Sequence, residues 1–215
     1  IFWEIIYCNQ DYLQMPQTVY FSTAYLPPAE YFARLLHYDI ALLEREENYL
    51  KQSYRNRCYI LSAGGPQMLT VPVLAGSRHK TLIKDIRIDY TKRWQQVHVG
   101  ALASSYRSSP FYLYYSEKFE KTILNKYDFL LDLNMDLIRE ILTILKSNIT
   151  LTYTTEFIKA GNTDNDFRYN INPKLPSKYR PKPYPQVFNV KDCYPNRLSI
   201  VDLIFNAGPE TVKYL

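Results

Sequence analysis

The chain has 215 residues, of which 47% are hydrophobic and 15% aromatic, and this composition is enough for one ordinary globular core. Its formal net charge of +5, from 26 basic and 21 acidic residues, is too small to predict a nucleic-acid-binding protein, although a local site for an anion would fit it. No apolar run reaches the roughly 18 residues of a transmembrane helix, so we expect a cytoplasmic protein without a membrane span.

The chain opens on IFWEIIYC, which is apolar but carries Glu4. No basic region precedes this stretch and no small-residue cleavage site follows it, so it does not resemble a signal peptide. The cysteines Cys8, Cys58 and Cys193 are widely spaced and form no C-x-x-C pair. We therefore expect free thiols, with no disulfide framework, no metal site and no cofactor.

The first half of the chain alternates strand and helix signals. TVYFS at 18–22 predicts a strand, PAEYFARLLHY at 28–38 predicts a helix with proline in its first turn, and IALLE at 40–44 predicts a second strand. The runs at 57–63 and 67–73 flank Gly64-Gly65-Pro66 and predict a hairpin. IKDIRID at 83–89 alternates apolar and charged residues, which is typical of a half-exposed strand.

From Thr91 onward the apolar period changes to three and four, which indicates helices. The residues that share one helical face are Trp94, Val97, His98, Ala101, Leu102, Ser105 and Tyr106. SSPFYLYY breaks this helix, and two more helices are expected over 117–133 and 134–146, with Asn134 as the cap between them. ITLTY at 149–153 predicts a further strand.

The last third of the chain is irregular and then helical. Residues 159–185 hold five prolines and predict a long surface loop. In LSIVDLIFNAGPE, Ser199 and Asp202 resemble a capping box, and Gly208 followed by Pro209 marks a helix end. We predict an α/β fold: a mixed sheet with an early β-α-β unit and a hairpin, then a mainly helical second half. One domain would span 1–215, with a core at 19–146, the proline-rich loop at 159–185 and a C-terminal motif at 186–212.

The stretch ENYLKQSYRNRC at 47–58 concentrates amide, phenol and guanidinium groups where a strand is expected to begin. If 51–60 is extended, Lys51, Ser53, Arg55 and Arg57 share one face, and Gln52, Tyr54, Asn56 and Cys58 share the other. Guanidinium groups bind phosphate or carboxylate oxygens in pairs, so these cations would suit a phosphorylated sugar. The alternative is that both arginines pair with structural acids such as Glu44, Glu46 or Asp85.

His98 lies one helical turn after Trp94, on the inward face of its helix. An inward imidazole would serve as a general base for a sugar hydroxyl or amine, or it is a hydrogen-bonded core residue. Asp85 would either orient His98 or hold an arginine. The sequence contains no P-loop, dinucleotide-binding, serine-hydrolase or zinc-protease motif. The residues that usually carry the corresponding activities are therefore missing.

Several motifs together resemble the WbqC-like family, and in particular its Bacteroidetes branch. The stretches that carry the resemblance, dense over 19–146 and 186–210, are TAYLPPAEYFARLLHYD, ENYLKQSYRNRC, LTVPV, KDIRI, SYRSSPFYLYY and LSIVDLIFNAGPE. Members of that family are encoded among genes for O-antigen and surface-polysaccharide assembly. The resemblance therefore implies an enzyme of that pathway, and transfer of an acyl or aminoacyl group to a sugar has been suggested for such proteins.

On this interpretation the partner is a sugar nucleotide or another phosphorylated sugar, together with other enzymes of glycan assembly. The 21 tyrosines fit such an amphipathic ligand or, more simply, an aromatic core. The candidate catalytic residues are His98 and Asp85, and the candidate substrate-binding residues are Lys51, Tyr54, Arg55, Asn56, Arg57, Trp94 and Tyr106. The alternative is a non-catalytic protein that binds a phosphorylated glycan intermediate. A nucleotidylyltransferase-like fold is a third reading, but the paired histidines it needs are missing, since only His37 lies in that region. A pocket holding both His98 and the two arginines would favour the enzyme.

Overall fold

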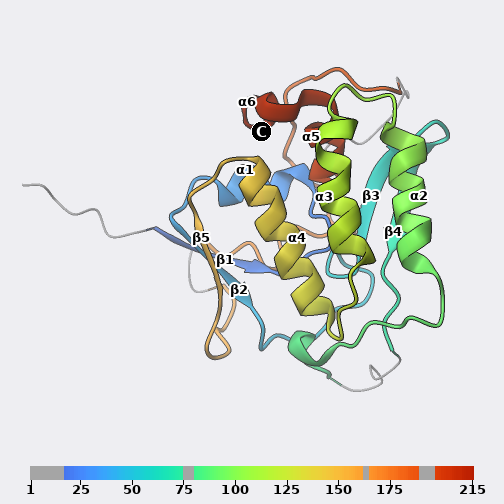
Figure 1. Ribbon diagram of the computed structural model, residues 1–215. Coiled ribbons are helices and arrows are strands. Elements are labelled where there is room, and N and C mark those ends of the chain that lie inside the picture. Colours follow the sequence, from blue (N-terminus) through green and yellow to red (C-terminus); the bar gives the residue numbers. More distant parts are fainter. Residues whose placement is uncertain (1–16, 75–79, 162–164, 189–196) are drawn as a thin grey trace, which may run out of the picture.

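The computed structural model describes residues 17–74, 80–161, 165–188 and 197–215. Its first unit is a parallel sheet of three strands, in the order β1-β2-β5 (Figure 1). The strands and the helix α1 that links the first two are β1 (Thr18–Ser22), α1 (Ala29–Leu35), β2 (Ile40–Glu44) and β5 (Thr150–Tyr153). Thr18 pairs with Ile40, and Ile40 pairs in turn with Thr150. The predicted β-α-β start is confirmed.

A hairpin forms a second, two-stranded sheet from β3 (Arg57–Ser62) and β4 (Gly65–Thr70). The chain reverses at Ala63-Gly64, and Gly65 has a φ of 104°, which glycine adopts without strain. The hairpin prediction is confirmed, although the turn is tighter than expected. The outer edge of β4 pairs with no other described strand.

The prediction of a strand at 83–89 is wrong. Residues Ile83–Asp85 form a 3₁₀ turn, η1, and beyond it only the isolated bridges Val73–Ile88 and Arg87–Phe129 form. The buried residues of this stretch are Ile83, Ile86 and Ile88. A 3₁₀ turn brings residues three apart onto one side, so it buries Ile83 and Ile86 together, which an alternating strand cannot do.

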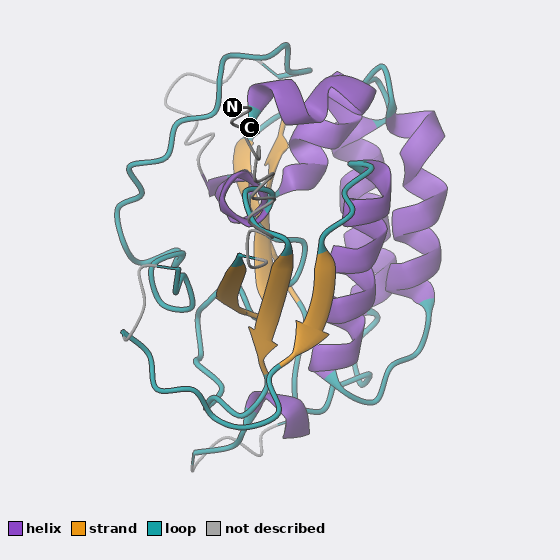
Figure 2. Ribbon diagram, turned by 90° about the vertical axis from the view of Figure 1, so that its left-hand side faces the viewer, coloured by secondary structure: helices purple, strands orange, loops and turns teal. Residues whose placement is uncertain are grey.

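Three helices form a layer on one side of the molecule and the strands lie on the other (Figure 2). They are α2 (Trp94–Tyr106), α3 (Tyr112–Leu124) and α4 (Leu130–Ile144). The break at SSPFYLYY is confirmed. Asn134 is not a cap, because α4 begins at Leu130 and runs through it, so the predicted helix over 117–133 is interrupted at 125–129. Asn134 is buried, and its Nδ2 donates to the carbonyl of Arg55.

The proline-rich region forms no helix and no multi-residue strand among its described residues. After it come α5 (Ile200–Ala207), the 3₁₀ turn η3 (Gly208–Glu210) and α6 (Thr211–Tyr214). Ser199 caps α5 by accepting the N–H of Val201. The capping-box role of Asp202 is wrong, because its carboxylate turns into the core and accepts hydrogen bonds from Tyr106, Tyr184 and Gln186.

The thiol of Cys58 is free and buried in β3, and burial raises its pKa. Cys8 and Cys193 lie outside the described residues. Over the described part of the chain, none of the helices is both long enough and apolar enough to cross a bilayer.

Candidate functional site

The patch at 47–58 is not the extended segment that the sequence predicts. Residues 51–55 form turns, Gln52 has a φ of 58°, and β3 begins only at Arg57. Lys51 is exposed, whereas Tyr54, Arg55 and Asn56 are buried. The predicted alternation of faces is therefore wrong, because a left-handed residue turns the chain before the strand begins.

Arg55 is 4% exposed and pairs with an acid that lies in the same patch. Its Nε and Nη2 donate to the two carboxylate oxygens of Glu47 at 2.9 and 2.6 Å, and Nη2 also donates to Ser22 Oγ at 2.7 Å. Burial raises the pKa of Glu47, while the Arg55 guanidinium and the Ser22 hydroxyl act in the opposite direction. Arg55 is thus held by an acid, as in the alternative interpretation, but by Glu47 rather than the three acids expected.

A second buried ion pair joins the proline-rich region to β2. Arg168 Nη1 donates to Glu44 at 2.9 Å and Nη2 to Asp166 at 2.7 Å, and the side chains of Arg168 and Glu44 are completely buried. Glu44 also accepts from the Thr154 hydroxyl. The sequence analysis named Glu44 as a structural acid but missed Arg168, because the two partners are more than a hundred positions apart and nothing local marks Arg168.

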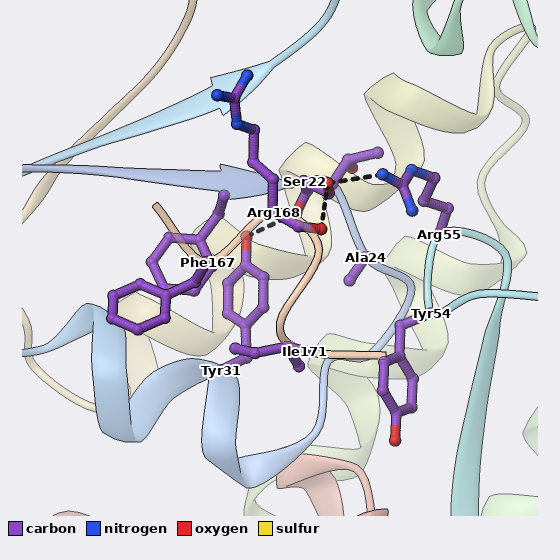
Figure 3. A pocket seen from close by; sticks show the side chains of 10 residues that line it. Ser22, Ala24, Tyr31, Tyr54, Arg55, Phe167, Arg168 and Ile171 are labelled. Carbon is purple, nitrogen blue, oxygen red and sulfur yellow. Dashed lines mark hydrogen bonds between the residues drawn. The ribbon is translucent and has the colours of Figure 1, made fainter. Parts of the chain in front are cut away.

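A small cavity lies beside these ion pairs, at the carboxyl end of β1 (Figure 3). In open sheets of parallel strands, ligands bind beyond the carboxyl ends of the strands. The residues that line the cavity are Phe21, Ser22, Thr23, Ala24, Tyr31, Tyr54, Arg55, Phe167, Arg168 and Ile171. Figure 3 shows Arg55 reaching Ser22 from one wall while the Tyr31 hydroxyl, which donates to the Ser22 carbonyl at 3.1 Å, rises from another. Two of the predicted substrate-binding residues, Tyr54 and Arg55, meet here.

His98 lies elsewhere, in a wall of a groove of about 440 Å³ between β4 and the start of α2. The groove is lined by residues 67–70, 72, 92–94, 97 and 98, which include Trp94 and the exposed cations Lys92 and Arg93. The imidazole is 3% exposed, and its Nδ1 lies 2.8 Å from the Tyr25 hydroxyl. Burial lowers the pKa of His98 to about 4, and a backbone hydrogen bond with Thr70 acts in the opposite direction. The ring is therefore neutral at pH 7.

Tyr25 contacts one lining residue of each cavity and lines neither of them itself. The backbone N–H of Tyr25 donates to the carbonyl of Tyr54 at 2.9 Å, and its hydroxyl contacts His98. Tyr25 itself is completely buried. His98 and Arg55 therefore line two separate cavities that share no lining residue, and Tyr25 connects them only through its contacts with Tyr54 and His98.

The other candidates have separate environments. Asp85 is exposed and, among the described residues, forms an ion pair neither with His98 nor with an arginine, so neither of its two expected contacts is present. The described partners of His98 are Tyr25 and Thr70. Tyr106 is 1% exposed, donates to Asp202 at 2.9 Å and accepts the N–H of Leu61 at 3.0 Å, which is the environment of a core residue.

Asn56 and Arg57 lie where β3 begins. The Nδ2 of Asn56 donates to the carbonyl of Val71 at 2.9 Å, so this side chain ties β3 to the end of the hairpin. Arg57 is half-buried and pairs across the hairpin with Thr70. Its Nη1 lies 3.5 Å from Met68 Sδ, which places it next to two residues of the groove lining without itself being one of them.

The model of the WbqC-like protein family matches residues 23–179, which include Tyr54, Arg55, His98 and Arg168. The uncharacterized protein Rv1507c of Mycobacterium tuberculosis is 30% identical over 95 residues, which cover 44% of this chain and about two fifths (41%) of that protein. No solved structure matches. Because the family model covers most of the chain, the protein described here belongs to the WbqC-like protein family.

Proposed function

We propose that this protein is an enzyme of surface-polysaccharide assembly, which binds a phosphorylated sugar in the groove between β4 and α2 and transfers an acyl or aminoacyl group to it. The observation that carries the proposal is the composition of the groove. Two exposed cations, Lys92 and Arg93, flank a cavity whose wall contains the aromatic ring of Trp94 and the neutral imidazole of His98.

Each part of the groove suits one part of such a ligand. Lys and Arg bind phosphate oxygens, and Arg does so through two parallel N–H groups. An aromatic side chain offers an apolar surface to the C–H face of a sugar ring. A volume of about 440 Å³ lies within the range of small-molecule sites.

The transfer step needs a base, and His98 is the candidate. A sugar hydroxyl or amine would attack the carbonyl carbon of the donor, a new C–O or C–N bond would form, and the bond from that carbon to the leaving group would break. The proton lost by the attacking group would pass to the neutral imidazole. Because Nδ1 already contacts Tyr25, His98 must exchange one of its present hydrogen bonds to accept it.

That engagement of His98 favours a second function, a non-catalytic protein that binds a phosphorylated glycan intermediate. An imidazole that is held by Tyr25 and by the Thr70 backbone is already satisfied, as expected of a structural histidine. In that case Lys92 and Arg93 still bind the ligand, but no step depends on the basicity of His98.

The test combines binding with analysis of the polysaccharide. Calorimetry with a panel of sugar nucleotides would compare wild type, Lys92→Gln, Arg93→Gln and, as a control, Lys159→Gln, which removes an exposed cation outside the groove. Strains carrying the groove variants or His98→Gln would be examined for acyl substituents on the surface polysaccharide.

If the protein is the proposed transferase, strains carrying the groove variants or His98→Gln should all lose the acyl substituent, while the folded His98→Gln protein should still bind the sugar nucleotide. If the protein only binds a glycan intermediate, Lys92→Gln and Arg93→Gln should weaken binding of the sugar nucleotide and alter the polysaccharide, and His98→Gln should do neither. If none of the sugar nucleotides binds and all strains make normal polysaccharide, both functions are contradicted.

A further inference from the structure

The strand β4 contributes four of its residues to the lining of the groove beside His98, and its backbone groups alternate in direction. The N–H of Val71, just beyond the strand, donates to the carbonyl of Asn56, so Val71 faces β3. In an antiparallel ladder every second residue faces the partner strand, and the residues between direct their N–H and C=O outward. Met68 is an outward residue. It lies opposite Tyr59, whose carbonyl points away from β4 and accepts the N–H of Ser199.

Most of the outward groups on this edge are absent or already bonded. Pro66 and Pro72 have no N–H to offer. The carbonyl of Pro72 accepts the N–H of Asp89. The carbonyl of Thr70 is bonded to the imidazole of His98. The outward groups that have no partner among the described residues are the N–H and C=O of Met68 and the N–H of Thr70.

This short set of free groups argues against a further β-strand as the partner. A strand from a second copy or from another protein needs donors along the whole edge, and prolines on an edge strand prevent such pairing. Pro66 and Pro72 lie on either side of the free groups, so Met68 alone is able to exchange two hydrogen bonds with a partner. The groove volume of about 440 Å³ also suits a small molecule.

The free groups define the chemistry of that molecule. In an outward residue the N–H and the C=O point the same way, side by side, so the partner must carry an acceptor next to a donor. Neighbouring hydroxyl groups on a sugar ring have this arrangement, since a hydroxyl both donates and accepts. An acetamido N–H beside a ring hydroxyl has it too. A phosphate group offers acceptors only and suits Lys92 and Arg93, which line the same groove.

We propose that the outer edge of β4 is the subsite for the sugar ring, in which two neighbouring ring substituents bind the C=O and N–H of Met68 and a third oxygen accepts the N–H of Thr70. The assignment rests on the phosphorylated sugar proposed for this groove, and it adds which sugars bind there. They are sugars with an unsubstituted donor and acceptor on neighbouring ring carbons.

The probes are glucose 1-phosphate, which has neighbouring hydroxyls, and N-acetylglucosamine 1-phosphate, which has an acetamido group beside a hydroxyl. Inorganic phosphate is the control. Calorimetry with the whole chain should show at least one sugar phosphate binding about tenfold or more tightly than phosphate, the scale of one hydrogen bond. The tighter of the two sugar phosphates identifies the pair of substituents that Met68 prefers.

Amide hydrogen exchange reports on the edge directly. The N–H groups of Met68 and Thr70 point outward, so they should exchange quickly in the free protein and slowly once the sugar phosphate is bound. Inorganic phosphate should leave both unprotected. The N–H of Leu69 faces β3, so it should be protected with and without ligand.

Met68→Pro removes the edge N–H, and an edge strand tolerates proline at an outward position, as Pro66 shows in the same strand. Affinity for the sugar phosphate should fall by about tenfold, while affinity for inorganic phosphate should not change. Met68→Leu changes the side chain and keeps the N–H, so it should bind the sugar phosphate as wild type does. Lys92→Gln should weaken the binding of phosphate and of sugar phosphate alike.

Three results would overturn the proposal: sugar phosphates that bind no more tightly than phosphate, an unchanged affinity in Met68→Pro, or a Met68 N–H that is protected in the free protein. Each leaves the phosphate site at Lys92 and Arg93 in place. If neither phosphate nor either sugar phosphate binds, the function proposed for the groove fails together with this subsite. If Met68→Pro does not fold, hydrogen exchange on wild type decides the question.

Discussion

The hydroxyl of Tyr25 and the Nδ1 of His98 lie 2.8 Å apart, and both side chains are buried. This contact connects the loop after β1 to the helix α2, across 73 positions of the chain. The Tyr25 ring also packs edge-on against Trp94, at 6.4 Å between centroids. Tyr25 therefore sets the position of the two residues that the groove takes from the inner face of α2.

Removing that hydroxyl with Tyr25→Phe should lower the free energy of unfolding by about 1–3 kcal/mol, because the substitution leaves a buried imidazole nitrogen without its partner. Urea denaturation would measure the loss. Tyr59→Phe is the matched control, since the Tyr59 hydroxyl makes no hydrogen bond to the described residues, and it should change stability by less than about 0.5 kcal/mol. Equal losses in the two variants would contradict the role assigned to Tyr25.

The lowered pKa of His98 makes stability depend on pH. Because the pKa is about 4 in the folded chain and near 6.5 in the unfolded one, the unfolded chain binds more protons at this residue between those values. The free energy of unfolding should therefore fall as the pH is lowered through this interval, by about 2–3 kcal/mol between pH 7 and pH 4.5.

The measurement is the difference between wild type and His98→Gln at each pH, which cancels the contributions of other titrating groups. That difference should shrink as the pH falls. A difference that stays constant from pH 7 to pH 4.5 would mean that the His98 pKa is not lowered.

The two arginines of the patch should respond differently to the same substitution. Arg55→Lys keeps the charge but loses the paired contact with the buried Glu47, so it should cost about 2–4 kcal/mol of stability. Arg57→Lys affects a half-buried side chain that forms no ion pair with described residues, and it should cost less than about 1 kcal/mol. Thermal melts compare the two variants, and similar losses would contradict this assignment.

Asp202 should be among the most sensitive polar residues of the protein. Asp202→Asn replaces an oxygen that accepts hydrogen bonds with an amide group that donates, against the donors Tyr106, Tyr184 and Gln186. We expect a loss of about 2–4 kcal/mol in chemical denaturation, since bonds to charged groups are strong and donors facing one another repel. Ser199→Ala, which removes only the cap of the same helix, should cost about 1 kcal/mol. Equal losses would show that Asp202 acts only within its helix.

Alanine substitutions at two glycines should change the stability of the protein in opposite directions. Gly208 has a φ of 54°, and a Cβ at this position would lie 2.5 Å from the ring of Phe111, so Gly208→Ala should lower the melting temperature strongly. Gly100 lies within α2 with open space around it, so Gly100→Ala should stabilise the protein by about 0.5–1 kcal/mol. Tolerance of alanine at Gly208 would mean that the packing of α5 against Phe111 is looser than described.

Local patterns were sufficient for most of the secondary structure. The strand of TVYFS, the helix that starts after Pro28, the hairpin around Gly64-Gly65 and the cap at Ser199 are confirmed, since each depends on residues close together in sequence. The prediction of a strand at 83–89 was wrong because Ile83 and Ile86 are three residues apart, and a 3₁₀ turn buries both of them.

The sequence by itself thus determined the family, the α/β class and the order of the elements, because periodicity, turn residues and motif order are local properties. Only the tertiary structure decided which charged and polar residues meet. Arg55 binds Glu47, Arg168 binds Glu44 from 124 positions away, and His98 contacts the Tyr25 hydroxyl. A buried polar group without a partner is costly, so the fold brings each of these groups next to one, however distant in sequence. For the same reason the chain packing, and not the spacing of motifs, separated the expected single pocket into a groove at His98 and a cavity at Arg55.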